Sequence, residues 1–397
     1  MTLSDDTAID RRHFLAGSAL LAGMAAGDLR AFATARDTDQ RLVVIVLRGA
    51  MDGLHVVPPH GDPHFAAMRA GREVANGGII DLDGFFGLDA EMGDLLPLWR
   101  GEELGFVHAV SSPYRSRSHF DGQDALENGT ASADGSDSGW LNRAIAALPP
   151  RPGAPLDPRR FAVNVGTGAE LILRGALPVG VWHPRADLEH DAEVRLFHQA
   201  LYENHPHFEK AYSEALLLDG EGALARRGER DGEATARLAA RLLREEARAV
   251  AFSINGWDTH LRIQNAAKAP MRALARALLS LRAELGEAWT ATTVVAISEF
   301  GRTVRLNGSK GTDHGTGGVM MVAGGGARGH GGGRVLSDWP GLGEGQLFED
   351  RDLMPTEDVR RFLAWTLART LDVPRPALER IVFPGLQMGN DPFRSRT

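Results

Sequence analysis

The stretch Thr293-Val-Val-Ala-Ile-Ser-Glu-Phe-Gly-Arg-Thr303 runs from an apolar strand directly into a polar loop. Further along, the same loop contains Thr312-Asp-His-Gly-Thr-Gly-Gly318, and a second apolar strand, Val319–Ala323, follows it. Loops at the strand ends of α/β sheets converge over the sheet edge, and ligands and metals are held there. Two interpretations of these polar residues stay open at this point: a site that carries chemistry, and a solvated loop with a helix-capping aspartate.

Two other strands end in a similar way. Ala251-Phe-Ser-Ile254 is followed by Asp258 and His260, and the unbroken apolar run Leu42–Leu47 is followed by Asp52 in a turn that contains glycine. Such an unbroken run is typical of a parallel strand that is buried on both faces. Three strands that each end in a carboxylate with a histidine nearby suit a divalent cation bound by aspartate, glutamate and histidine.

The segments between these strands predict helices. Leu261–Leu285 has apolar residues at helical spacing, and it separates the strand before Asp258 from the strand before Glu299. This order is a βαβ unit, whose strands are parallel. Five prolines between residues 149 and 158 mark a connector. The predicted fold class is therefore α/β, a doubly wound and mostly parallel sheet with helices on both faces, in a single domain over residues 41–397.

The amino terminus has the pattern of an export signal. Arg11 and Arg12 precede an apolar stretch that continues to Ala26, and Ala31-Phe-Ala33 has the small-x-small pattern of a cleavage site. The apolar stretch is too short to cross a bilayer core of about 30 Å. Residues 1–33 are therefore predicted to be a twin-arginine signal peptide, with an amphipathic first helix as the alternative. The mature chain is expected in the periplasm or outside the cell, after passage through the twin-arginine translocase.

The composition excludes several classes of protein. The chain has 397 residues, a net charge of −8 and no cysteine. The lack of cysteine excludes disulfides, thiol catalysis and thiolate metal sites. A mildly acidic chain without a run of lysine and arginine does not suit a nucleic-acid partner. After the signal, no apolar stretch approaches the ~20 residues of a membrane span, so none is predicted in the mature chain.

Two glycine-rich motifs imitate known sites. Gly324–Gly329 has the spacing G-x-G-x-x-G after a strand, but a dinucleotide site also needs a helix that begins there. The next residues, His330-Gly-Gly-Gly-Arg334, are unsuited to starting a helix. They also imitate the oxyanion loop of esterases, but the chain has no G-x-S-x-G elbow. This segment is predicted to be a connection between strands.

One more polar loop follows a buried strand. The strand is Leu104–Val110, and the loop is Tyr114-Arg-Ser-Arg-Ser-His-Phe-Asp-Gly-Gln123. Two roles for Ser118 stay open: the N-cap of a helix, and a nucleophile beside a metal. In the second role, Arg115 or Arg117 would hold the oxyanion.

Six motifs together resemble the domain-of-unknown-function 1501 family, which consists of exported bacterial proteins, usually with a twin-arginine signal. The motifs are Arg48-Gly-Ala-Met-Asp-Gly-Leu54, Ser118-His-Phe-Asp-Gly-Gln-Asp124, Gly139-Trp-Leu-Asn142, Trp257-Asp-Thr-His260, Ser298-Glu-Phe-Gly-Arg-Thr303 and Thr312-Asp-His-Gly-Thr-Gly-Gly318. The family has no settled activity, but it is similar in fold to the alkaline phosphatase-like superfamily of phosphatases, sulfatases and cofactor-independent phosphoglycerate mutases. The resemblance implies a doubly wound sheet with a divalent metal centre at the carboxyl ends of its strands.

The resemblance also implies roles for particular residues. Asp52 matches the first-strand metal aspartate of that superfamily, and His314 matches its last metal histidine. Ser118 stands where its nucleophile would be sought. Asp258 and His260 stand in the region of its Asp-x-x-x-His ligand pair, at a shorter spacing.

Ser298-Glu299 occupies the strand end where the superfamily has Asp-His, so a one-metal or metal-free descendant of the two-metal site stays open.

We predict an exported metal-dependent hydrolase of phosphate or sulfate esters; a non-catalytic periplasmic binding or assembly protein of the same fold is the alternative. The expected cation is zinc, manganese or calcium, and the expected substrate is a small anionic ester. The expected metal ligands are Asp52, Asp258, His260, Glu299, Asp313 and His314, and the expected catalytic residues are Ser118, His119 and Arg302. Ser118 or a metal-bound water would attack the ester, and Arg302 would neutralise charge on the transferred or departing group.

Overall fold

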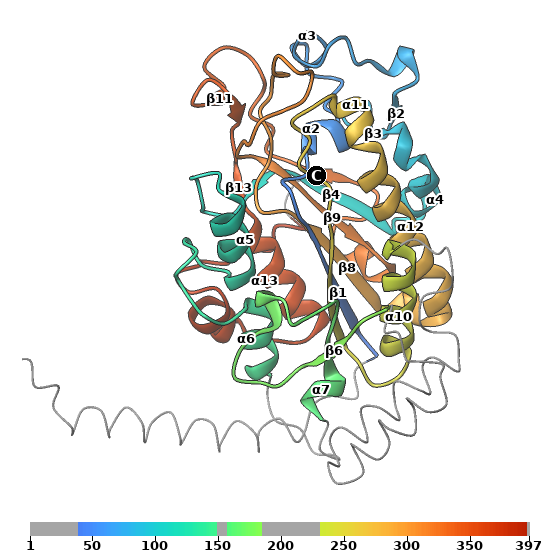
Figure 1. Cartoon of the computed structure of the whole chain (residues 1–397), viewed down its shortest axis with the longest axis vertical. Coiled ribbons are helices and arrows are strands. Elements are labelled where there is room, and N and C mark those ends of the chain that lie inside the picture. Colours follow the sequence, from blue (N-terminus) through green and yellow to red (C-terminus); the bar gives the residue numbers. More distant parts are fainter. Residues whose placement is uncertain (1–38, 149–156, 185–230, 395–397) are drawn as a thin grey trace, which may run out of the picture.

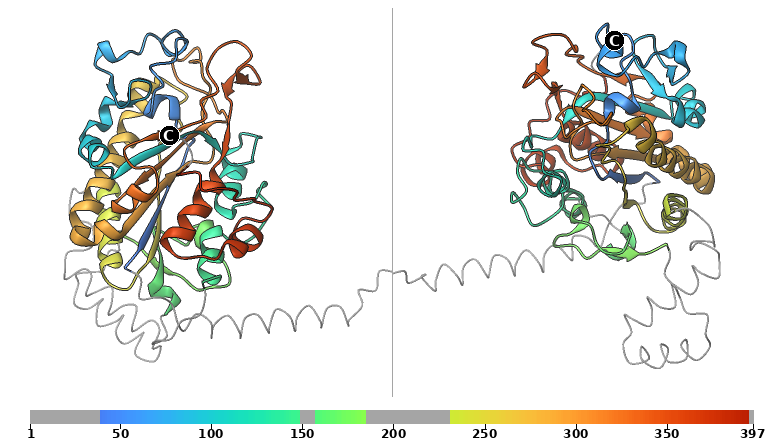
Figure 2. Two further views of the ribbon diagram at one scale, coloured as in Figure 1. Left: turned by 180° about the vertical axis from the view of Figure 1, so that it is seen from behind. Right: turned by 45° about the horizontal axis from the view of Figure 1, so that its top comes forward.

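The computed structural model describes residues 39–148, 157–184 and 231–394 (Figure 1). The predicted signal peptide (1–33) and most of the predicted proline-rich connector (149–156) lie outside these residues. A large sheet runs through the middle of the described part, with helices on both sides of it (Figure 1, Figure 2).

The sheet has nine strands, eight of them in the order β10-β4-β9-β8-β1-β7-β5-β6, and the ninth, β13, pairs with β4. They are β1 (Arg41–Leu47), β4 (Leu104–Ser111), β5 (Ala162–Val165), β6 (Gly180–Trp182), β7 (Ala249–Ile254), β8 (Thr292–Ile297), β9 (Gly318–Ala323), β10 (Val335–Leu336) and β13 (Glu357–Asp358). β9 runs antiparallel to both of its neighbours, β4 and β8, and the other pairs in the sheet are parallel. The described residues therefore form a mixed, mostly parallel sheet, as the βαβ pattern predicts.

The central strand β1 is buried on both faces. Val43 and Ile45 belong to the core on one side of the sheet, and Val44 and Val46 belong to the core on the other side. The strand lies between β7 and β8, and it is parallel to both. A parallel strand covered by helices on both faces needs apolar residues at every position, so the predicted place of this run in the sheet interior is confirmed.

Helices cover each face of the sheet, as predicted. The helices α10 (Asp231–Arg244) and α12 (Lys268–Leu285) pack on the face that Val43 shares. On the other face, residues of α5 (His119–Asn128), α6 (Trp140–Ala146) and α13 (Val359–Thr370) complete the core. Burial of a leucine or methionine side chain on such a face contributes about 1.5–3 kcal/mol, so this packing is the main source of stability.

The helix predicted over Leu261–Leu285 begins later and is interrupted. The structure has a short helix, α11 (Ile263–Ala266), and then α12. Arg262 has a φ of 43°, which no α-helix accommodates, and Leu261 pairs with Lys310 of another loop. The first residues of the predicted helix are therefore used to hold two loops together.

The glycine-rich connection after β9 is a short 3₁₀ helix, η6 (Gly325–Gly329), which leads toward β10. Gly324 has a φ of 97°, and a Cβ there would lie 2.1 Å from the carbonyl oxygen of Thr292. The glycine is needed for this close approach, and the prediction of a connection between strands is confirmed.

Shorter elements complete the described part. They are α2 (Gly53–Val56), α3 (Phe65–Met68), η2 (Val74–Asn76), β2 (Ile79–Asp81), β3 (Gly87–Asp89), η3 (Ala90–Leu95), α4 (Leu96–Arg100), α7 (Pro158–Phe161), η4 (Leu171–Leu173), η5 (Gly286–Ala291), β11 (Leu347–Phe348), β12 (Asp352–Leu353), α14 (Arg375–Ala377) and η7 (Leu378–Val382). Among the helices of the described ranges, none is long and apolar enough to cross a membrane.

Four strands end at the same edge of the sheet. β4 and β8 are both antiparallel to β9, so they run in the same direction as each other, and β1 and β7 share that direction. The loops 48–52, 112–118, 255–262 and 298–317 leave this edge, which lies toward α2 in Figure 1. The polar clusters noted in the sequence are therefore brought to one place.

Candidate metal centre

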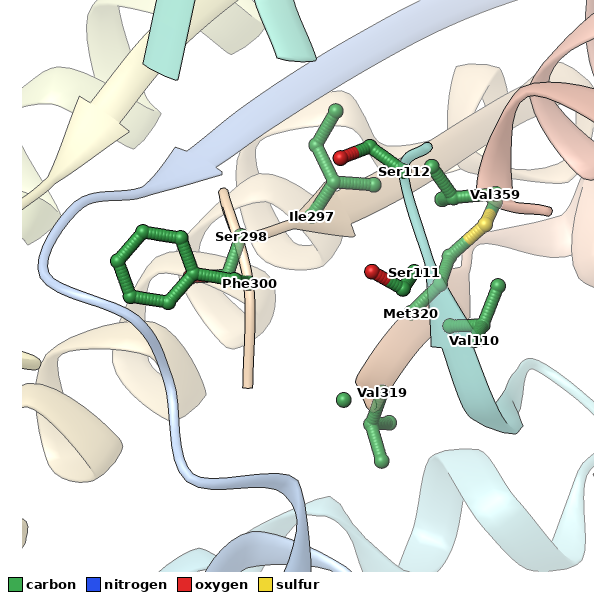
Figure 3. A pocket seen from close by; sticks show the side chains of 10 residues that line it. Val110, Ser111, Ser112, Ile297, Ser298, Phe300, Val319, Met320 and Val359 are labelled. Carbon is green, nitrogen blue, oxygen red and sulfur yellow. The ribbon is translucent and has the colours of Figure 1, made fainter. Parts of the chain in front are cut away.

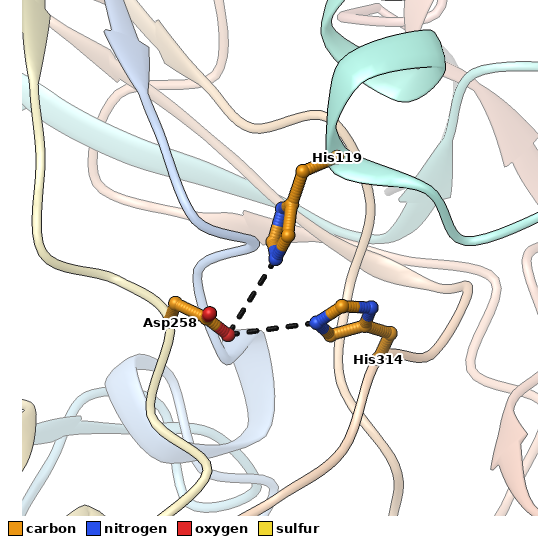
Figure 4. A group of neighbouring side chains, drawn as sticks. All are labelled: His119, Asp258 and His314. Carbon is orange, nitrogen blue, oxygen red and sulfur yellow. Dashed lines mark ion pairs between the residues drawn. The ribbon is translucent and has the colours of Figure 1, made fainter.

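Three segments at this edge bring histidine and aspartate together. His119 is the first residue of α5, Asp258 follows β7, and His314 lies in the long loop between β8 and β9. Figure 4 shows these three side chains turned toward one another. Each offers one ligand atom, and the three atoms lie within 4.8 Å of one another.

Asp258 is the common partner in this group. Its Oδ1 lies 3.5 Å from Nε2 of His119, 3.5 Å from Nε2 of His314 and 3.0 Å from Nε2 of His260. The Nε2 atoms of His260 and His314 are 2.9 Å apart. Ligands about 2.1 Å from a metal are separated by roughly 3.0 Å in an octahedron and roughly 3.4 Å in a tetrahedron. These four separations are those of neighbouring ligands of one cation: His119 and His314 group with Asp258, and His260 lies next to Asp258 and His314.

The His119 imidazole is oriented by a buried carboxylate. Its Nδ1 lies 2.8 Å from Oε1 of Glu299, and because an ionised carboxylate only accepts, Nδ1 carries the proton. Nε2 then offers a lone pair, and this atom is buried without a hydrogen-bond partner. The hydrogen bond to Glu299 raises the pKa of His119. A carboxylate on the outer nitrogen is typical of a metal-binding histidine, whose basicity it increases.

The other two imidazoles are held in the same way. Nδ1 of His314 donates to the backbone carbonyl of Arg117 at 2.9 Å, and Nδ1 of His260 donates to Oδ1 of Asp313 at 3.0 Å. With their protons on Nδ1, both rings present the lone pair of Nε2 to the centre. Both lone pairs lie near Oδ1 of Asp258, so a cation could be bound between these groups. Asp313, an expected ligand, instead acts through His260.

Glu299 was also expected to be a ligand, but the structure places it behind His119. It accepts hydrogen bonds from His119, from the Gln123 amide at 3.1 Å and from the backbone nitrogen of Gly49 at 2.8 Å. Burial tends to raise the pKa of Glu299, but these donors outweigh it and hold the pKa below its usual value. Gly49 has a φ of 114°, and a Cβ there would come within 2.5 Å of the backbone nitrogen of Asp258, so glycine is required.

Arg302 was expected to face the substrate, and the structure uses it internally instead. Its guanidinium is 1% exposed and donates to four backbone carbonyls, those of Gly49, Ala50, Trp257 and Thr312. It also donates to Oδ1 of Asp258, and Nη1 lies 3.5 Å from Nε2 of His260. Burial tends to raise the pKa of Asp258, but Arg302 outweighs it and lowers the pKa. Arg302 therefore keeps Asp258 ionised and in place. Because its N–H groups already donate to these internal acceptors, Arg302 does not face a substrate.

Asp52 was expected to be the first-strand ligand, and the structure pairs it with an arginine. Both oxygens accept from Arg69, at 2.9 and 3.1 Å, and Oδ2 also accepts from the Thr312 hydroxyl at 3.0 Å. Its Oδ1 caps α2 through the backbone nitrogen of His55. Burial tends to raise the pKa of Asp52, and the charge and hydrogen bonds of Arg69 outweigh it and lower the pKa. Asp52 is thus a buried ion pair and helix cap, separate from the group around Asp258.

Ser118 occupies the N-cap position of α5, directly before His119. Its backbone is extended, but its hydroxyl makes no capping hydrogen bond. The side chain is half-buried, and the backbone N–H of Ser118 donates a hydrogen bond to the Tyr114 hydroxyl at 3.0 Å. Arg115 donates to nearby backbone carbonyls, and Arg117 forms ion pairs with Glu349 and Asp352. Arg117 is therefore not free to serve as the expected oxyanion partner, and Nη1 of Arg115 is already used in backbone contacts.

A small cavity lies beside the centre, between the ends of β4 and β8 (Figure 3). Ser111, Ser112, Ser298 and Phe300 line it together with apolar side chains, and its volume is about 10 Å³. That volume suits a single water molecule. The Ser112 hydroxyl is buried without a hydrogen-bond partner, so a water there would satisfy it. The cavity is too small for an ester substrate.

Two functional contacts were not anticipated from the sequence. His119 was expected to be catalytic, whereas its Nε2 is one of the three atoms that lie together at the centre. The carbonyl of Arg117 orients His314, and a backbone contact of this kind leaves no trace in the side-chain pattern. The only available signal was the position of His119 in the Ser118–Asp124 motif, after a strand that ends at the same edge.

Comparisons with known proteins identify the family. No curated protein matches the chain. The crystal structure of Ps i-CgsB in complex with k-i-k-neocarrahexaose is 11% identical with a TM-score of 0.40, and the match covers 84% of this chain and 72% of that one. The C-terminal periplasmic domain of EcEptC from Escherichia coli, in complex with Zn, is 9% identical with a TM-score of 0.31, covering 73% and 75%. These likenesses are too weak to bear on function. The model of the family described as "Protein of unknown function (DUF1501)" matches residues 99–382, which is more than half of the chain, and the protein belongs to that family.

Proposed function

We propose that this protein is an exported, metal-dependent hydrolase of phosphate or sulfate esters with an alkaline phosphatase-like fold. One observation carries the proposal: Nε2 of His119, of His260 and of His314 each lies within 3.5 Å of Oδ1 of Asp258, while each imidazole is held by an acceptor on its other nitrogen. Three nitrogens and one oxygen suit zinc better than calcium, which prefers oxygen ligands. Of the three expected cations, we therefore propose zinc.

The surrounding residues have separate tasks in this proposal. Glu299 and Asp313 fix the protons of His119 and His260 on the outer nitrogens, and Arg302 holds Asp258 ionised. When bound, a zinc ion would polarise an ester oxygen and lower the pKa of a bound water. Ser118 lies next to His119 in the chain and has no capping role, so we propose it as the nucleophile.

The charge of the centre supports an anionic substrate. Among the four side chains, Asp258 is the only carboxylate, and a histidine carries no negative charge. A divalent cation held by one carboxylate keeps a net positive charge, and such a site attracts phosphate or sulfate groups. The attraction does not need Arg302, which is occupied inside the protein.

Hydrolysis of p-nitrophenyl phosphate and p-nitrophenyl sulfate tests this function. We expect the mature chain to hydrolyse one of them when loaded with zinc, to lose the activity in EDTA, and to regain it when zinc is restored. Ser118→Ala should lower kcat by several orders of magnitude, whereas Ser116→Ala, an exposed serine in the same loop, should not. Zinc binding without turnover of either ester would contradict the hydrolase and favour a binding protein.

Export is a separate part of the proposal, supported by Arg11 and Arg12 before the apolar stretch. Changing both to lysine should leave the precursor in the cytoplasm, and Arg30→Lys is the control that should be exported normally. The mature amino terminus, measured by mass spectrometry, should follow Ala33. Equal periplasmic amounts of the double variant and the parent would contradict the signal.

A further inference from the structure

Asp352 is a buried carboxylate that the site described above does not include. It is the first residue of β12, in a short hairpin far along the chain from His119 and Asp258. Its side chain is 0% exposed. Neither its position in the sequence nor its neighbours mark it as functional, yet a buried charge needs specific partners.

The partners of Asp352 come from two different loops of the candidate centre. Oδ2 accepts from the Arg117 guanidinium, at 2.9 Å from Nε and 2.7 Å from Nη2. The same oxygen accepts from the Thr316 hydroxyl at 2.9 Å. Arg117 is two residues before His119, and Thr316 is two residues after His314. One carboxylate oxygen therefore ties together the two loops that carry these histidines.

Arg117, the partner of Asp352, also contacts His314 through its backbone carbonyl. Arg117 has a φ of 60°, the left-handed conformation that residues other than glycine rarely adopt, so something must hold it there. In this conformation its carbonyl accepts the Nδ1 proton of His314 at 2.9 Å. The ion pair with Asp352 fixes the side chain of the residue whose backbone orients the histidine.

We propose that Asp352 is a positioning residue of the metal centre, which acts through Arg117 and Thr316 to aim Nε2 of His314 and His119 at Asp258. The proposal rests on the metal centre proposed above. Arg351, its neighbour, adds a second link, because its Nη2 donates to the carbonyl of His314. Outer residues that orient metal ligands cost about 10- to 100-fold in metal affinity when they are replaced.

The negative charge of Asp352 is the feature to remove. Asp352→Asn keeps the shape, and an amide oxygen in place of Oδ2 can still accept hydrogen bonds. The variant loses the charge that pairs with Arg117, whose other partner, Glu349, is largely exposed. Oδ1 of Asp352 has no hydrogen-bond partner, and Nε of Arg351 lies 3.6 Å from it. An amide nitrogen in place of Oδ1 would face the N–H donor of Arg351. The variant should therefore loosen the loops that carry His119 and His314.

Zinc affinity of the full mature chain, measured by competition with a chromophoric chelator, tests the proposal. Asp352→Asn should bind zinc about 10- to 100-fold more weakly than the parent. Asp62→Asn is the matched control: Asp62 is also buried and accepts from Trp339 and from the backbone of His64 and Leu342, none of which belongs to the centre. It should melt at a lower temperature and keep the parent's zinc affinity.

A second variant keeps the proposal open to test if Asp352→Asn does not fold. Thr316→Val removes one of the two links and should weaken zinc binding severalfold in a folded protein. Arg117→Ala and Asp352→Asn should also be non-additive, because both break the same link. Parent-like zinc affinity in Asp352→Asn, or in Thr316→Val if the first is unfolded, would overturn the positioning role. If the parent itself bound no zinc, the result would contradict the proposed metal centre and therefore also the positioning role of Asp352.

Discussion

The central sheet and the loops at its carboxyl edge are built by different physical means. In β1, every residue is buried and all but Arg41 are apolar, and the place of the strand follows from its own sequence pattern. At the edge, the side chains that matter are charged or polar, and each is held by a residue far away in the chain, such as His119 by Glu299. The sheet is stabilised by the burial of apolar surface area, whereas the side chains at the edge are held in position by ion pairs and directed hydrogen bonds. Substitutions should therefore affect stability in the first region and metal binding in the second.

The largest expected effect is in the sheet. Val44→Asp should give no soluble protein, because an unpaired carboxylate in the middle of β1 costs several kcal/mol. Val181→Asp is the matched control, since Val181 lies on the edge strand β6 and is 43% exposed. Soluble yield and melting temperature of the two variants check this. If Val44→Asp folded with the parent's melting temperature, β1 would not be the centre of the sheet.

Acid should weaken the packed region through two buried histidines. Burial lowers the pKa of His108 and of His330 to about 4, so the native state binds fewer protons than the unfolded state below the ordinary pKa of 6.5. Their stabilising contribution is present above about pH 6.5 and is lost as the pH falls toward 4, by at most about 3 kcal/mol for each. Urea unfolding in EDTA at pH 7 and pH 4.5 measures the difference.

His108→Gln sharpens this test, because glutamine can keep the contact with the carbonyl of Val57 and does not titrate. The variant should lose less stability than the parent between the two pH values. An equal loss in both would show that His108 does not contribute to the acid sensitivity.

At the edge, a substitution should separate metal binding from folding. His314→Ala should lower zinc affinity by more than the about 10- to 100-fold expected for an outer residue, while the sheet stays folded. His64→Ala, an exposed histidine outside the centre, is the control. Chelator competition and melting in EDTA are the measurements. A His314→Ala variant that unfolds in EDTA, or that binds zinc as the parent does, would contradict the claim that residues at the edge affect metal binding and not folding.

The smallest effect is expected at an exposed apolar side chain, that of Phe120, which follows His119 in the chain. Phe120 is 84% exposed, so Phe120→Ser should change the free energy of unfolding by less than about 0.5 kcal/mol. Leu126, in the same helix α5, is buried, and Leu126→Ser should cost several times more. Comparable losses in the two variants would mean that α5 is not oriented as described.

The same difference explains how much the sequence could predict. The unbroken apolar pattern of Leu42–Leu47 is enough to predict that this strand is buried. The alternation of strands with helices such as α12 predicts a parallel sheet, whose strands end at a shared edge. Asp52 shows where this reasoning stops. Its place after β1 predicts a ligand, but whether a carboxylate meets a cation or an arginine depends on Arg69, which no local pattern links to it.

Arg302, Glu299 and Asp313 show the same limit. Their positions at strand ends are right for a site, but the sequence does not tell which of them faces the centre and which stands behind a histidine. That choice is set by distances of about 3 Å between loops that are far apart in sequence. Asp258, His260 and His314 do lie together, and the structure adds His119 to them.

Metal content is the most direct test of the central claim. The mature protein, purified without chelator, should contain a stoichiometric amount of zinc by elemental analysis, and EDTA should lower its melting temperature because the bound cation stabilises the native state. Restored zinc should bring the melting temperature back. A protein that holds no stoichiometric metal and melts identically with zinc, manganese, calcium or EDTA would contradict the account.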